Sequence, residues 1–133
     1  MSETTRTLAG ILLLSLVTVE TGGVYLVQLV RGTAPATPFQ LAFARAGHAH
    51  AGVLLIVSLT GLLYADSVHL TGLWGWLARI GAPAAALMMP AGFFFSSMGA
   101  GRNTPNAFIA LVYAGGLTLA AGLTSLGIGL LVA

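Results

Sequence analysis

Two histidines and an arginine lie within six residues of one another, in a stretch otherwise apolar enough to cross a membrane. The stretch reads Arg45-Ala-Gly-His48-Ala-His50-Ala-Gly52. Ionisable side chains at bilayer depth are energetically costly, so they normally face a bundle interior, a cofactor or a water-filled cavity. Imidazole is also the commonest metal ligand in proteins and the usual protein ligand of haem iron. We therefore expect any chemistry of this chain at these residues.

The spacing of the two histidines limits what they can bind together. His48 and His50 are two residues apart, so about 200° separates them around a helix and they do not share a face. One metal ion held by both from a regular helix is therefore not expected. One histidine is predicted to act as a ligand while the other forms a hydrogen bond elsewhere. The alternative is that both are core histidines, bonded to the backbone or to Glu20.

A single carboxylate, Glu20, lies near the middle of the first apolar stretch, just before Gly22-Gly23. At that depth it is either protonated or paired with Arg45 or a histidine of the second stretch. It would serve as a proton relay, as a group that fixes a ligand's tautomer, or as a substrate contact. The structural alternative is a clamp between two helices. Glu20 is thus the candidate catalytic residue.

The composition narrows the class of protein. The 133 residues leave room for one domain. Hydrophobic residues make up 57% of the chain and charged residues 6%, against roughly 25% charged residues in a soluble globule. The five arginines are scattered and form no basic patch of the kind that binds nucleic acid. The absence of cysteine excludes disulfides, thiolate-bound zinc and iron–sulfur clusters.

Four apolar stretches predict the fold. They cover about residues 8–30, 39–65, 74–97 and 106–133, and each exceeds the roughly 20 residues that cross a bilayer. Backbone groups in lipid must bond within their own segment, which requires helices. The short connections make neighbours antiparallel. Residues 1–133 are therefore predicted to form one all-α domain, a four-helix up-down bundle spanning a lipid bilayer.

Local signals add detail to this prediction. Thr37-Pro38 with Gln40 is a capping box that should start the second helix. Small residues four apart, such as Gly81 and Ala85, allow close helix approach in the bundle or in an oligomer. Arg79, which follows two tryptophans, is interpreted as an anchor at the lipid–water interface. The short polar loop with Asp66 and His69 is expected to be solvated.

The tract Phe43-Ala-Arg-Ala-Gly-His-Ala-His-Ala-Gly52, with residues 92–97 and 102–106, resembles styrene oxide isomerase. That family comprises small four-helix bacterial membrane enzymes that form trimers and bind haem b. Its second helix carries Trp-Ala-Arg-Ala-His-Ser-Gly, whose histidine is the axial haem ligand. Without gaps this histidine falls on His50, whereas matching the arginines brings His48 closer. The resemblance implies a haem b cofactor with His50, ahead of His48, as the iron ligand, and Arg45 in the cofactor site.

Two polar residues of the family's tracts are replaced in this chain. The tyrosine of its third-helix tract, Gly-Phe-Tyr-Leu-Phe-Ser, corresponds to Phe94, and the asparagine six residues after the haem histidine corresponds to Ile56. Both groups help to orient the epoxide in the family. The resemblance therefore implies haem binding more directly than it implies turnover of styrene oxide.

Three functions follow as hypotheses. The first is an epoxide isomerase, in which ferric haem opens a small apolar epoxide as a Lewis acid to give an aldehyde or ketone. The second is a haem-binding membrane subunit for sensing or electron transfer. The third is a proton- or ion-coupled transporter without haem. The resemblance favours the isomerase, as a multi-pass homotrimer in a bacterial plasma membrane.

Overall fold

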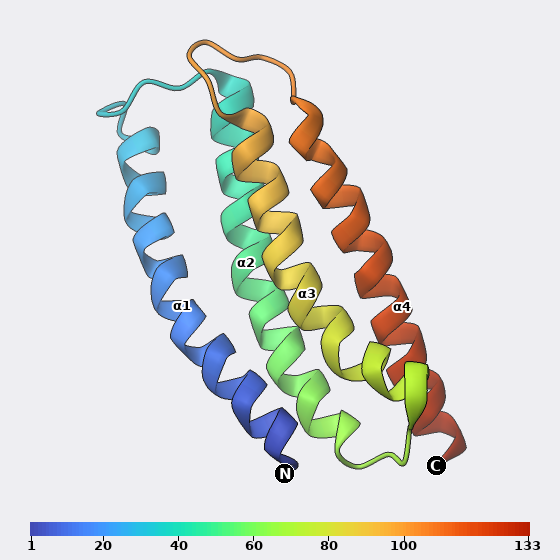
Figure 1. Ribbon diagram of the computed structural model, residues 1–133. Helices are drawn as coiled ribbons and strands as arrows, with labels where there is room; N and C mark the ends of the chain where they lie inside the picture. Colours follow the sequence, from blue (N-terminus) through green and yellow to red (C-terminus); the bar gives the residue numbers. More distant parts are fainter.

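The computed structural model describes all 133 residues, which form four long helices joined by short loops (Figure 1). The helices are α1 (Glu3–Val30), α2 (Pro38–Ala65), α3 (Gly72–Ser97) and α4 (Ala110–Val132), and a 3-10 turn, η1 (Ala107–Ile109), leads into α4. Neighbouring helices run antiparallel, and both termini lie at the same end of the bundle. Each helix is long and apolar enough to cross a membrane. The predicted all-α bundle of four membrane-spanning helices is confirmed.

The start of α2 follows the predicted capping box. The hydroxyl of Thr37 accepts from the backbone N–H of Gln40, and the Gln40 side chain accepts from that of Thr37. These two bonds satisfy backbone donors that the first turn of a helix leaves free. The Gln40 amide also donates to the carbonyls of Ser97 and Gly99 at the end of α3. The cap therefore ties together the two loops at this end of the bundle.

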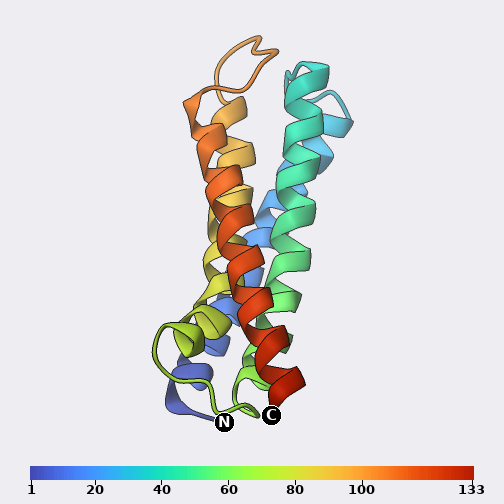
Figure 2. The ribbon, with the colours of Figure 1, turned by 90° about the vertical axis from the view of Figure 1, so that its right-hand side faces the viewer.

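The four helices do not pack equally. α3 lies between α2 and α4 and packs closely against both, whereas α1 packs mainly against α2 and does not touch α4. In Figure 2, α3 and α4 lie together on one side of the upper half, and α1 and α2 on the other. Only Thr5, Leu12 and Leu29 of α1 are buried. Most of the surface of α1 therefore faces outward, towards lipid or another molecule.

α3 and α4 approach each other closely at Gly81 and Gly122. A Cβ on Gly81 would lie 2.6 Å from the Cα of Gly122, and one on Gly122 would lie 2.8 Å from the Cα of Gly81. Such a distance excludes any side chain without a shift of the backbones. The sequence left open whether the small residues of these helices serve the bundle or an oligomer, and Gly81 serves the bundle.

A polar cluster joins the start of α1 to the corner between α2 and α3. Asp66 accepts hydrogen bonds from the Ser2 N–H (2.7 Å), the Ser2 hydroxyl (2.9 Å) and the Thr5 hydroxyl (2.8 Å). A guanidinium nitrogen of Arg79 lies 3.6 Å from the same carboxylate and donates to the Ala65 carbonyl. Asp66 is therefore not merely solvated, and Arg79 is more than an interfacial anchor. The sequence could not reveal the cluster, because Ser2 and Asp66 are 64 residues apart.

The cluster also sets the acidity of Asp66. Burial favours a higher pKa for its carboxyl, but the hydrogen bonds from Ser2 and Thr5 and the positive N-terminus outweigh burial and hold the pKa below its usual value. A carboxyl with a lowered pKa in the folded state stabilises that state above its unfolded pKa of about 3.9. The stabilisation is lost as the pH falls through the lowered, folded-state pKa.

Asp66→Ala is expected to lower the free energy of unfolding by about 1–2 kcal/mol at pH 7, because hydrogen bonds to a charged group are lost. Thermal unfolding in detergent, followed by circular dichroism, measures the change. The difference in the free energy of unfolding between Asp66→Ala and the unmodified chain should shrink as the pH falls below about 3.9. His69→Ala is the control, since His69 is exposed and should change nothing. If Asp66→Ala lowers the free energy of unfolding equally at pH 7 and well below a pH of about 3.9, the role of the ionised Asp66 is contradicted.

Candidate functional site

His48 and His50 face different helices, as their spacing predicts. The ring of His48 lies against α1, where a Cβ on Gly23 would be 3.3 Å from its Cε1 and one on Gly22 would be 3.7 Å from its Nδ1. The ring of His50 lies against α3, with its centroid 4.9 Å from that of Phe93. The glycine pair of α1 thus gives His48 room, while an aromatic ring packs on His50. The two imidazoles have separate surroundings.

The protonation pattern of His50 follows from one short contact. Its Nδ1 lies 2.7 Å from the carbonyl oxygen of Ala46, one turn earlier on α2. A carbonyl oxygen only accepts, so Nδ1 carries a hydrogen, and in the neutral form of the ring the unshared electron pair lies on Nε2. Nε2 has no protein partner and is not fully buried. This is the arrangement that orients metal-bound imidazoles, in which the second ring nitrogen donates to a carbonyl or carboxylate.

Aromatic rings form the surroundings of His50. The Phe93 ring is tilted 38° to the imidazole, and the Phe43 ring stands edge-on to Phe93 at 5.5 Å. No charged side chain forms a hydrogen bond or an ion pair with His50. The side of α2 that carries His50 therefore offers an imidazole nitrogen without a protein partner next to apolar, polarisable surfaces.

His48 lies between two grooves and has no hydrogen bond to the protein. An inner groove of about 210 Å³ lies between α1, α2 and α3, where Pro90 and Phe94 form part of its wall. An outer groove of about 610 Å³ runs along α1, and its lining includes Glu20, Arg31 and His48. The structure thus brings Glu20 and His48 to one groove, which His50 does not line.

Arg45 also lies apart from His50. The two residues are five positions apart on α2, so their side chains leave the helix about 140° apart. Arg45 is three residues before His48 and lies one turn from it on a neighbouring face. Within one chain, the sequence candidates therefore form two sets, with His50 on one side of α2 and Glu20, Arg45 and His48 on the other.

The positions where the chain departs from the family's tracts also lie away from His50. Ile56 is 63% exposed on the outer face of α2. The Phe94 ring packs against Gly47, where a Cβ would be 2.9 Å from the ring. Phe93, not Phe94, contacts His50. Neither replaced polar group would therefore have adjoined this imidazole within one chain.

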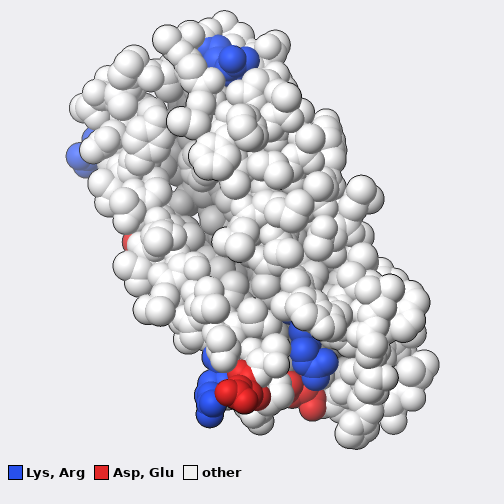
Figure 3. Space-filling view, viewed as in Figure 1, with Lys and Arg blue, Asp and Glu red and all other residues white.

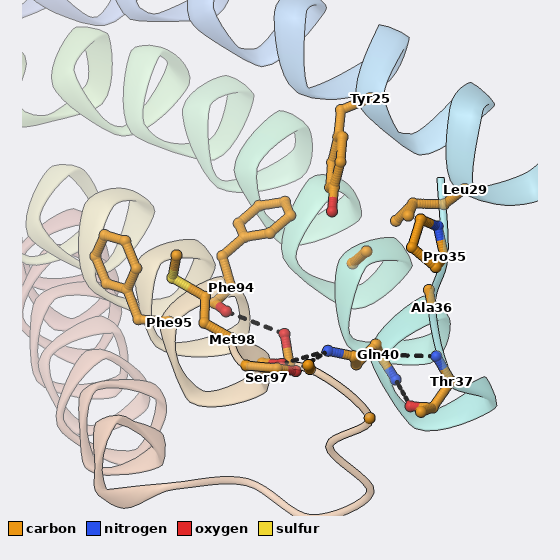
Figure 4. A pocket seen from close by; sticks show the side chains of 14 residues that line it. Tyr25, Leu29, Pro35, Ala36, Thr37, Gln40, Phe94, Phe95, Ser97 and Met98 are labelled. Carbon is orange, nitrogen blue, oxygen red and sulfur yellow. Dashed lines mark hydrogen bonds between the residues drawn. The ribbon is translucent and has the colours of Figure 1, made fainter. Parts of the chain in front are cut away.

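A cavity of about 750 Å³ lies at the end of the bundle where the two tied loops meet (Figure 4). Its polar lining groups are mostly engaged: Gln40 bonds to the Ser97 and Gly99 carbonyls, and the Ser97 hydroxyl donates to the carbonyl of Phe94. Tyr25 points its hydroxyl into the cavity from α1 (Figure 4) and has no hydrogen-bond partner. Tyr25 was not predicted from the sequence. The available signal was a polar-tipped aromatic near the end of a span.

No group of three or more His, Asp or Glu side chains is placed to chelate a metal ion. Haem iron is a different case, because the porphyrin supplies four nitrogens and one imidazole can complete a site.

No known family model, curated protein or solved structure matches this chain. Function is therefore inferred from the residues themselves and from the resemblance of their tracts.

Proposed function

We propose that this chain binds haem b through Nε2 of His50. The observation that carries the proposal is the 2.7 Å contact from Nδ1 to the Ala46 carbonyl, which leaves Nε2 free with its electron pair. A neutral imidazole of fixed tautomer, beside apolar surface, is what an axial haem ligand requires. His48 is the alternative ligand, but its ring nitrogens have no hydrogen bond to orient them.

The residues present fit such a group. His50 would hold the iron, and Phe93 and Phe43 would supply apolar surface beside it. A partly exposed imidazole on an outward-facing part of α2 is accessible to a cofactor that enters from the bilayer. Arg45, which the resemblance assigns to the cofactor site, leaves α2 on another side and would not hold the group within the same chain.

The reaction that we infer is the isomerisation of a small epoxide to an aldehyde or ketone. When bound through His50, ferric haem would supply a Lewis acid for the epoxide oxygen. The product would be a carbonyl compound of the same formula, so the overall reaction would balance within one substrate molecule. No second substrate or reductant is needed. The residues around His50 favour a neutral substrate, because a buried charge without a partner is costly.

Membranes containing the protein are expected to convert at least one member of a panel of aryl and alkyl epoxides to its carbonyl isomer, measured by gas chromatography. Membranes with His50→Ala are the control and should return every epoxide unchanged. Unchanged epoxides with intact haem in the unmodified protein would exclude the isomerase and leave a haem-binding module. A low-spin spectrum, with both axial positions filled, would favour sensing or electron transfer instead.

The resemblance supports two further parts of the proposal. The first is that the chain is a multi-pass protein of a bacterial plasma membrane, and the second is that it assembles as a homotrimer. The outward-facing surface of α1 leaves space for neighbouring copies.

A further inference from the structure

The outward flank of the α1–α2 hairpin carries two opposite charges that have no partner within the chain. Glu20 on α1 and Arg45 on α2 are both exposed, and the single ion pair of the protein joins Arg79 to Asp66. On the face in Figure 3, the other charged side chains gather at the two ends of the bundle and leave a broad uncharged belt between them. Glu20 and Arg45 are therefore exceptions to the charge distribution of a membrane-spanning bundle.

Both residues lie at the depth of the hydrocarbon core. Glu20 is ten residues from the end of α1 and Arg45 seven from the start of α2, which corresponds to about 15 Å and about 10 Å along the helix axes. Each helix has 28 residues and is about 42 Å long, so about 6 Å at each end extends beyond a core of about 30 Å. Acyl chains offer neither counter-charge nor hydrogen bonds to the two groups.

The two charges lie on one continuous flank. Glu20 lines the outer groove together with His48, and Arg45 is one turn from His48 on α2. A surface that carries both signs is complementary to itself, which suits contact between identical subunits. Ala49 and Gly52 lie near Arg45 on α2, and a Cβ on Gly52 would meet no atom within 4 Å. These small residues leave room for another helix to approach.

We propose that a second copy of this chain covers this flank, so that Glu20 pairs with the partner's Arg45. The contact gives α1 a second close neighbour, because within its own chain α1 packs mainly against α2 and only slightly against α3. It also removes both charges from lipid. The proposal does not depend on haem, since neither residue contacts His50.

Cross-linking tests the pairing, and the chain contains no cysteine of its own. Two differently tagged copies, one with Glu20→Cys and the other with Arg45→Cys, are co-expressed and treated in membranes with a short bifunctional maleimide. A maleimide is preferable because two long paired side chains hold their backbones further apart than a disulfide can bridge. We expect a covalent product that carries both tags.

The matched control replaces Arg45→Cys by Leu117→Cys. Leu117 is exposed and lies seven residues after the start of α4, which begins at the same end of the bundle as α2. The Glu20→Cys and Leu117→Cys pair should give at least roughly tenfold less product, the factor that corresponds to 1.4 kcal/mol. Equal yields from the two pairs would overturn the proposal.

A single chain that carries both Glu20→Cys and Arg45→Cys shows the symmetry of the assembly. A covalent dimer as the final product indicates a two-fold pair and a covalent trimer indicates a closed ring, and both contain the proposed contact. Cross-links confined to one chain would overturn the proposal, since Glu20 would then pair with Arg45 of the same copy.

Charge reversal is a second test. Glu20→Arg and Arg45→Glu should each reduce co-purification of two tagged copies about tenfold, and a chain with both substitutions should restore co-purification.

Discussion

His50→Gly is expected to lose haem, with the haem-to-protein ratio falling at least about tenfold, which corresponds to 1.4 kcal/mol of binding free energy or more. The physical reason is that the bond from Nδ1 of His50 to a backbone carbonyl fixes the tautomer of the ring and leaves Nε2 free to bind iron. No other histidine of the chain has such a bond. The ratio is measured by the pyridine haemochrome assay on protein purified in detergent. Added imidazole should restore binding, because it can occupy the space of the missing ring.

His48→Gly is the matched control for this experiment. It makes the same change two residues earlier on α2, on the side that faces Gly22 and Gly23. Haem should be retained. If His48→Gly loses haem and His50→Gly keeps it, His48 is the ligand and the assignment made from the Ala46 contact is wrong. If both variants keep haem, neither histidine is essential for binding it.

Gly81→Leu is expected to cause a large loss of stability, because it lies in the close α3–α4 contact. Its Cβ would lie 2.6 Å from the Cα of Gly122 and 2.9 Å from the carbonyl oxygen of Thr118, so the helices must separate. Overpacking costs about 1–3 kcal/mol and occasionally more. Leucine has the higher helix propensity, by roughly 0.8 kcal/mol, so any net loss comes from the contact. Thermal unfolding in detergent measures the effect.

Gly116→Leu serves as the control on α4, because a Cβ there would meet no atom within 4 Å. It makes the same replacement of a helical glycine and should leave the unfolding temperature unchanged or slightly raised. Equal unfolding temperatures for the Gly81 and Gly116 variants would contradict the observed close approach of α3 and α4.

The helices were predictable from the sequence because their causes are local. The four apolar stretches have the length of a bilayer crossing, and the Thr37 capping box fixes where α2 starts. The opposite orientations of His48 and His50 were also predictable, since a helix turns by a fixed angle per residue. These features depend on residues a few positions apart.

The remaining features depend on contacts between distant residues, which one sequence does not reveal. Asp66 meets Ser2 and Thr5 only because α1 and α2 are antiparallel and of equal length. Tyr25 lines a cavity that exists where two loops converge. The sequence left open whether Glu20 pairs with Arg45 or a histidine, and the structure places it in a groove with His48 and without an ion pair.

Haem titration followed by absorption spectroscopy decides whether this bundle is a haem protein. Protein purified in detergent from haem-replete cells should show a Soret band, and protein from haem-depleted cells should gain that band on addition of haemin. The band should saturate at one haem per chain, and His50→Ala should not gain it. A colourless preparation from haem-replete cells, with no saturable Soret band on titration, would contradict the account.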